Sequence, residues 1–241
     1  MNDLVGRLRA AGCVFAEEEA ELLASAAPSP DELESLVAQR VSGVPLEHLL
    51  GWVEFHGLRV AVSPGVFVPR RRTEFLVDQA LTYVRPDSVV VDLCCGCGAL
   101  GAAVLAAVPS VSLYAADIDP AAVACARRNV PRVYQGDLFD ALPLSLQGKV
   151  SVVMANVPYV PTEAISTMPP EAREHEPRVA LDGGPDGLAV ARRVLAAAPA
   201  WLAPGGVVLF EASPAQAASL SDVRVVYSDE WESTVVIRSH V

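Results

Sequence analysis

The sequence predicts an α/β fold, a mostly parallel sheet of seven strands with helices on both faces, preceded by a small helical region and a β-hairpin linker. From residue 88 onward, short apolar runs that suit buried strands alternate with Ala- and Leu-rich helical segments. A chain of 241 residues also has room for one large core and a small appendage. We expect the helical region at 1–50, the linker at 51–70 and the main domain at 71–241.

Composition and charge narrow the class of protein. Charged residues at 20% and apolar residues at 52% are typical of a globular protein. The net charge of -11 argues against direct nucleic-acid binding, which normally needs a basic face, and suits a basic protein partner better. No secretory leader and no run of about 18 apolar residues is evident, so we expect no membrane association and a cytoplasmic location.

The cysteines indicate neither a disulfide framework nor a metal site. There are five, an odd number, and three of them (Cys94, Cys95 and Cys97) crowd one turn. A zinc site usually needs a second pair of ligands, which Cys13 and Cys125 do not supply. We therefore expect no metal, and interpret the three cysteines as small residues packed around a tight loop.

The first 77 residues contain helical segments and one hairpin. Residues 2–27 carry apolar positions at helical spacing, and Ser29–Glu32, with Pro30 in the first turn, is a helix-start signal. Segments 53–56 and 58–62 alternate apolar and polar residues around Gly57, which predicts a hairpin. Segment 66–77 leads into another helix.

Three consecutive arginines, Arg70, Arg71 and Arg72, precede that helix. Such a run is most often a solvated surface. Its place between the hairpin and the main domain makes a border of the active site the alternative interpretation.

Residues 88–108 read as strand, glycine turn and helix. Ser88–Val91 form the strand, Asp92 closes it, and a turn with Gly96 and Gly98 opens the helix. Glycines allow positive φ and let a ligand lie against the backbone, where the N–H groups of the helix start face it. The spacing Asp-x-x-x-Gly-x-Gly is shorter than the dinucleotide pattern and looks like the first motif of class I S-adenosylmethionine methyltransferases. We expect Asp92, Cys94, Gly96 and Gly98 to bind this cofactor.

The next two strands each end in an acidic residue. Strand 111–116 is followed by Asp117, Ile118 and Asp119; an acid at this place can accept hydrogen bonds from ribose hydroxyls, so we assign that role to Asp117. Asp119 precedes Pro120 and suits the N-cap of a helix to residue 129. Strand 132–136 is followed by Asp137, placed to contact the adenine amino group, or else simply a turn aspartate. Ile118 and Leu138 are expected to line the same cofactor site.

The segment after the fourth strand, 150–155, is the most informative for chemistry. It reads Asn156, Val157, Pro158, Tyr159 and stands where ligands of open α/β sheets bind. An asparagine there offers one acceptor and two donors to a planar amide or amidine, and an aromatic ring can hold that plane. The segment therefore suggests methylation of a planar nitrogen; an ordinary turn with a core tyrosine is the alternative.

The remaining segments complete the sheet. We predict a helix over 186–202 and strands at 207–210, ending at Glu211, and at 223–227 and 233–238. Paired prolines and glycines mark one long loop, from about 160 to 187, which is expected to cover the site.

Taken together, the motifs resemble one family, the release-factor glutamine N5-methyltransferases. The matching segments are Gly43–Gly51, Val68–Glu74, the glycine turn, Asp117–Asp119, Gly136–Phe139, Asn156–Tyr159, Glu171–Pro177, Ala180–Gly184, Asp186–Leu188 and Leu202–Gly206. The resemblance implies a class I S-adenosylmethionine-dependent methyltransferase fold behind an N-terminal helical domain and a hairpin. It implies as substrate the glutamine of a Gly-Gly-Gln loop in a peptide-chain release factor.

The resemblance also assigns roles. Catalysis falls to Asn156, Val157, Pro158 and Tyr159: the Asn156 side chain and the Val157 carbonyl accept the two amide hydrogens, while Tyr159 packs on the amide plane. Asn156 also borders the cofactor. Substrate binding falls to Asn156, Pro158 and Tyr159, with Arg70 and Glu176.

Two features differ from the family pattern. Val157 stands where the family has proline, and the N-terminal region is shorter than the family's usual helical domain. A related branch with its own substrate is therefore an alternative. The other hypotheses are a small-molecule amide or amine N-methyltransferase, a nucleic-acid adenine N6-methyltransferase, and a non-enzymatic protein that only binds S-adenosylmethionine.

Overall fold

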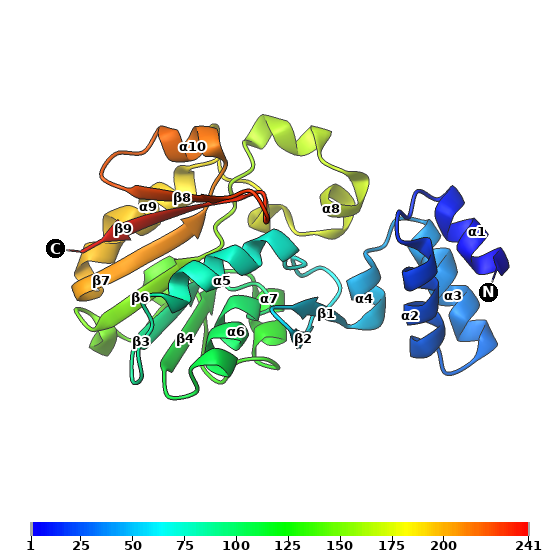
Figure 1. Ribbon diagram of the computed structural model, residues 1–241, viewed down its shortest axis with the longest axis horizontal. Helices are drawn as coiled ribbons and strands as arrows, with labels where there is room; N and C mark the ends of the chain where they lie inside the picture. Colours follow the sequence, from blue (N-terminus) through cyan, green and yellow to red (C-terminus); the bar gives the residue numbers. More distant parts are fainter. Residues whose placement is uncertain (1, 241) are drawn as a thin grey trace.

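The computed structural model describes residues 2–240 and is built around one seven-stranded sheet (Figure 1). The strands are β3 (Val89–Leu93), β4 (Ser112–Asp117), β5 (Val133–Gln135), β6 (Val150–Ala155), β7 (Leu202–Glu211), β8 (Arg224–Ser228) and β9 (Ser233–Ser239). Their order is β5-β4-β3-β6-β7-β9-β8. The first five are parallel, and β9 runs antiparallel to both β7 and β8. The predicted fold class is confirmed.

Strand order reverses beside β3, and this reversal creates the site. From β3 the chain moves outward to β4 and β5, then returns to place β6 on the other side of β3. Leu93 and Ala155, the last residues of β3 and β6, are register partners. The loops after these strands therefore diverge at one edge of the sheet and leave a crevice, the usual ligand site of open α/β folds.

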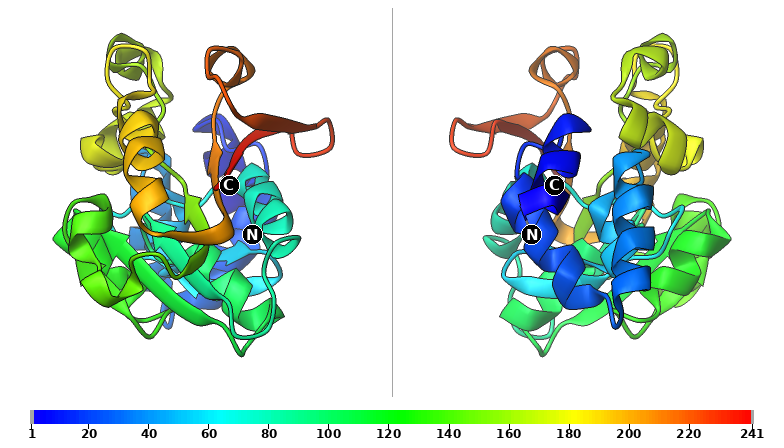
Figure 2. Two further views of the ribbon diagram at one scale, coloured as in Figure 1. Left: turned by 90° about the vertical axis from the view of Figure 1, so that its left-hand side faces the viewer. Right: turned by 90° about the vertical axis from the view of Figure 1, so that its right-hand side faces the viewer.

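Helices cover both faces of the sheet (Figure 2). One face carries α5 (Glu74–Leu81), α6 (Ala99–Ala107) and α7 (Pro120–Ala126); the other carries α9 (Ala189–Ala197) and α10 (Pro214–Ala218). Neighbouring residues of β3 alternate between these layers, with Val90 in the first core and Val91 in the second. A strand buried on both faces needs apolar residues at every position, which explains the continuous valine run.

The N-terminal helices form a separate small core, joined to the sheet domain by a hairpin (Figure 1). The helices are α1 (Asn2–Ala10), α2 (Ala16–Ala26), α3 (Pro30–Val41) and α4 (Leu46–Leu50), and the hairpin pairs β1 (Trp52–Phe55) with β2 (Leu58–Ala61). Ser29 caps α3 by accepting from the Glu32 N–H, so the predicted start signal is confirmed. The division at residues 50 and 70 stays a prediction.

The predicted helix 186–202 is wrong at both ends. The helix α9 covers only Ala189–Ala197, a 3-10 turn follows at Ala198–Ala200, and β7 already begins at Leu202. Leu202 pairs with Val150, but pairing resumes only between Val207 and Val152. The intervening Ala-Pro-Gly-Gly stretch bulges because proline lacks an N–H, and Gly205 has a φ of 76°.

The helix predicted from Pro120 to residue 129 ends at Ala126 instead. The side chain of Asn129 turns back and bonds to the backbone of Ala61 and Cys97. These bonds tie β2 to the glycine turn, while the backbone continues past Ala126 in a hydrogen-bonded turn that ends at Val130.

The segment expected as one long loop carries short elements. They are the 3-10 turns η4 (Thr162–Thr167) and η5 (Arg178–Ala180), separated by α8 (Pro170–His175). Between residues 2 and 240, we find no helix with the length and apolar character needed to cross a bilayer.

Candidate active site

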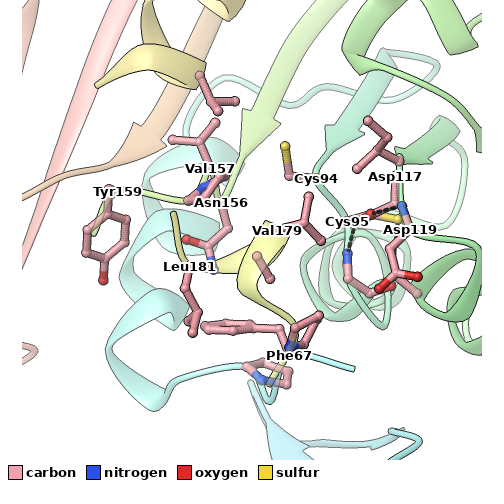
Figure 3. Close-up of a pocket in the computed structure, with 18 of the residues that line it drawn as sticks. Phe67, Cys94, Cys95, Asp117, Asp119, Asn156, Val157, Tyr159, Val179 and Leu181 are labelled. Carbon is pink, nitrogen blue, oxygen red and sulfur yellow. Dashed lines mark hydrogen bonds between the residues drawn. The ribbon is translucent and has the colours of Figure 1, made fainter. Parts of the chain in front are cut away.

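A cavity of about 220 Å³ opens at the edge of the sheet where β3, β4 and β6 end (Figure 3). It brings together most of the residues predicted from sequence: Arg70, Cys94, Gly96, Asp117, Ile118, Asp137, Leu138, Asn156, Val157, Pro158 and Tyr159. Asp92, Gly98 and Glu176 do not line it. The cavity joins the predicted cofactor residues on one side to the Asn156–Tyr159 segment on the other.

The glycine turn presents its backbone to this cavity. Gly96 has a φ of 55°, and a Cβ placed on it would meet no atom within 4 Å, so this side of the turn is open. The Gly96 N–H donates to Asp117 Oδ2 at 2.8 Å. Gly98 serves packing instead, because a Cβ there would lie 3.2 Å from Val130 Cγ2. Glycine at this position lets the turn pack against the chain beyond α7.

Asp117 is fixed by backbone donors at the cavity wall. Besides Gly96, the N–H of Asp119 donates to Asp117 Oδ1 at 2.9 Å. Burial raises the pKa of Asp117 above its ordinary value, and these backbone donors oppose the increase. The next side chain, Ile118, is 50% exposed although apolar, and it lines the cavity. A carboxylate beside an exposed apolar side chain suits a ribose and an adjoining base.

The other two acids near this wall are also accounted for. Asp119 caps α7 by accepting from the Ala121 N–H at 2.8 Å, as predicted. Asp137 lines the cavity and accepts from Arg193 Nη2 at 2.6 Å. Arg193 comes from α9, so this pair joins α9 to the loop after β5.

Asp92 lies behind the glycine turn rather than in the cavity wall. Its side chain is fully buried, and Oδ2 accepts from the Gly101 N–H at 3.0 Å. Oδ1 has no hydrogen-bond partner among residues 2–240. Burial raises the pKa of Asp92 to about 7, with the nearby Asp117 carboxylate adding to the increase.

The Asn156–Tyr159 segment leaves β6 directly into the cavity. The Asn156 amide points into the space bordered by Leu181 and Val179 (Figure 3). Val157 is buried, whereas the Tyr159 hydroxyl is held by two charged side chains: it donates to Glu211 Oε1 at 2.9 Å and accepts from Arg72 Nη2 at 2.5 Å. Burial, with Glu211, raises the pKa of Tyr159 to about 12.

Two further segments, 67–72 and 177–181, close the cavity with mostly apolar side chains, including Phe67, Val179 and Leu181. Glu176 joins these segments from behind. It accepts from the Val68 N–H at 3.1 Å and from Arg70 Nη2 at 2.6 Å. Burial raises the pKa of Glu176, and Arg70 opposes the increase. The structure thus places Glu176 beneath the predicted substrate wall.

Of the three consecutive arginines, two border the cavity and one lies on the solvated surface. Arg70 and Arg72 line the cavity, while Arg71 is exposed and its guanidinium lies 5.9 Å from the centre of the Trp231 ring. Sequence reasoning assigned no site role to Phe67, Leu181 or Glu211. Of these three residues, Glu211 alone has a sequence feature that indicates a site role, since it is an acidic residue at the end of an apolar strand.

Comparisons with known proteins find methyltransferases that are similar to this chain. A family model described as "Methyltransferase small domain" matches residues 57–169. A release factor glutamine methyltransferase of Mycolicibacterium smegmatis is 40% identical over 83% of this chain and 78% of its own length. A 4-amino-L-phenylalanine/4-methylamino-L-phenylalanine methyltransferase of Streptomyces pristinaespiralis is 37% identical over 81% of this chain and 70% of its own.

Among solved structures, a methyltransferase from Pyrococcus furiosus has the same fold. It is 16% identical, with a TM-score of 0.57, and the match covers 77% of this chain and 90% of that protein. At this identity the likeness concerns the fold alone.

Proposed function

Because the chain belongs to the release factor glutamine methyltransferase family, we propose that it methylates the side-chain amide nitrogen of a glutamine in a peptide-chain release factor, with S-adenosylmethionine as methyl donor. The observation that carries the proposal is the Asn156–Tyr159 segment, which leaves β6 into the same cavity as the glycine turn and Asp117. A donor bound at the turn and an acceptor held by Asn156 would meet in this cavity.

The residues present fit the donor. The open face of Gly96 and the Asp117 carboxylate form a cradle for a nucleoside with an amino-acid tail, and Ile118 and Leu138 supply apolar surface for its base. When bound, S-adenosylmethionine supplies a methyl group activated by the attached sulfonium. Asp137 would accept from the adenine amino group.

The chain's own contribution is to orient a poor nucleophile. An amide nitrogen shares its lone pair with the carbonyl, so transfer relies on in-line placement and on acceptors that stabilise the charge developing on nitrogen. The Asn156 side-chain oxygen and the Val157 carbonyl provide two such acceptors for the amide hydrogens. Val157 supplies its carbonyl as proline would, and the buried side chain restrains the backbone.

Substitution of Asn156 tests this assignment. We expect Asn156→Ala to reduce methyl transfer to the release factor by about 100-fold or more, because a positioned acceptor is lost. Affinity for S-adenosylmethionine, measured by calorimetry, should change much less. Gln147→Ala, at an exposed position away from the cavity, is the control. Undiminished turnover in the Asn156 variant would refute the role of this residue.

A second acceptor class is supported by the Streptomyces relative, which is named as a methyltransferase of 4-amino-L-phenylalanine and 4-methylamino-L-phenylalanine. An arylamine, like an amide, is a planar nitrogen with a delocalised lone pair. The apolar wall of Phe67, Val179 and Leu181 would suit a ring as well as a glutamine side chain. Parallel assays with the release factor and with 4-amino-L-phenylalanine distinguish the two, since the true substrate should show far higher kcat/KM.

A further inference from the structure

Glu211 is a buried carboxylate that lies outside the cavity lining yet holds a residue of the proposed site. It is 3% exposed, at the end of β7. Its Oε1 accepts from the Tyr159 hydroxyl at 2.9 Å and from Arg72 Nε at 3.0 Å, and its Oε2 accepts from Thr73 Oγ1 at 2.8 Å. A buried carboxylate is costly unless such donors satisfy it. Two protein side chains, Glu211 and Arg72, therefore hold the Tyr159 hydroxyl.

The main chain of Tyr159 is held as firmly as its side chain. Gln216, 9% exposed, donates from Nε2 to the Tyr159 carbonyl at 2.8 Å and to the Asp186 carbonyl at 3.0 Å. Its own Oε1 accepts from the Ser213 N–H at 2.9 Å in the capping box of α10, which fixes its orientation. Gly187 packs so closely that a Cβ there would lie 2.2 Å from the Tyr159 oxygen.

From these contacts we propose that Glu211 and Gln216 are positioning residues for methyl transfer. They hold Tyr159 at its hydroxyl and at its carbonyl, and thereby fix the neighbouring acceptor groups of Asn156 and Val157. The inference rests on the proposed use of segment 156–159 as the acceptor site. Ala155 and Phe210 are register partners, so Glu211 stands on the strand next to Asn156 and the bond to Tyr159 crosses only one strand spacing.

Rate depends on this arrangement because reacting atoms must be aligned, and a displacement of about 1 Å can cost about 100-fold in rate. The bond between Tyr159 and Glu211 also defines the role of the ring. Tyr159 contributes its aromatic face and its fixed backbone to the site, while its hydroxyl serves to hold the ring in place.

A double-mutant cycle tests the proposal. We expect Glu211→Gln to lower kcat by about 10-fold or more, with the affinity for S-adenosylmethionine within about 2-fold of the parent. Glu211→Gln removes the charge on the acceptor of this bond and Tyr159→Phe removes its donor, so both act on one contact and the double variant should be no slower than the slower single variant. The control is Glu230→Gln, an exposed acid in the β8–β9 turn, and it should behave like the parent.

Calorimetric binding of S-adenosylmethionine reports the folded fraction of each variant and separates slow transfer from loss of folding. Should Glu211→Gln fail to fold, Tyr159→Phe still tests the bond, since Arg72 and Thr73 continue to satisfy Glu211. Full kcat in either folded variant, or losses that multiply in the double variant, would overturn the proposal.

A readout without any acceptor separates this inference from the identity of the substrate. In protein labelled with 3-fluorotyrosine, the fluorine resonance that Tyr159→Phe removes belongs to Tyr159. In Glu211→Gln this resonance should shift and titrate at lower pH, because the Glu211 charge helps to raise the pKa of Tyr159. Failure to methylate the release factor would refute the proposed substrate alone, whereas an unmoved Tyr159 resonance would refute the positioning role.

Discussion

Asp92 should make the free energy of unfolding fall as pH rises from about 4 to about 7 in the cofactor-free protein. Its carboxyl is fully buried and its pKa is about 7 when folded, against an ordinary 3.8. Between these values the folded chain keeps the proton and the unfolded chain releases it. The stabilisation is therefore complete below the lower value and lost above the higher one, and it amounts to at most about 4 kcal/mol.

Asp92→Asn tests this linkage, because an amide keeps an acceptor for the Gly101 N–H but does not titrate in this range. Urea unfolding between about pH 5 and pH 8 should show the Asn variant gaining stability relative to the parent by a few kcal/mol, mostly below pH 7. Asp229→Asn, at an exposed position, should run parallel to the parent. Parallel curves for Asp92→Asn as well would refute the burial argument.

Two further predictions use pairs of sites matched in one property. Gly187 and Gly65 have φ of 75° and 76°, but of these two only Gly187 has atoms within 2.2 Å of an added Cβ. In urea unfolding, Gly65→Ala should lower the free energy of unfolding by about 1–2 kcal/mol and Gly187→Ala by about 1–3 kcal/mol more. Equal losses would contradict the clash at Gly187. Arg40 pairs with Glu19 at 2.6 Å in a nearly buried site, whereas Arg7 pairs with Glu34 in an exposed one. In urea unfolding, Arg40→Met should lower the free energy of unfolding by about 3–5 kcal/mol and Arg7→Met by less than about 1 kcal/mol. Similar losses in the two variants would contradict this ranking.

Residues adjacent in sequence at strand ends were predictable. A valine run followed by Asp92 and a glycine turn, or strand 150–155 followed by Asn156, carries its structural meaning within about ten residues. The parallel sheet then brings these strand ends to one edge. For this reason Cys94, Asp117 and Asn156 line one cavity as expected.

The supporting residues were not predictable because their partners lie far apart in the chain. Tyr159 is hydrogen-bonded to Arg72, Glu211 and Gln216. No local spacing of residues predicts bonds between positions so far apart in the chain. Glu176 belongs to a motif that predicts a contact with substrate. Its carboxylate instead accepts from Arg70 behind the cavity wall, and this partner also lies far away in the chain. Two predicted helix ends were wrong, at residues 127–129 and 198–202. At the first, a side chain bonds to backbone far away in the chain, and at the second a strand with a bulge begins.

The most direct test of the proposed function is methyl transfer from labelled S-adenosylmethionine to purified release factor from the same cell. The matched acceptor has the glutamine of its Gly-Gly-Gln loop changed to alanine. The account predicts label on the native factor alone, mapped to that glutamine by mass spectrometry. Absence of label from the native factor, while calorimetry shows the enzyme binding S-adenosylmethionine, would contradict it.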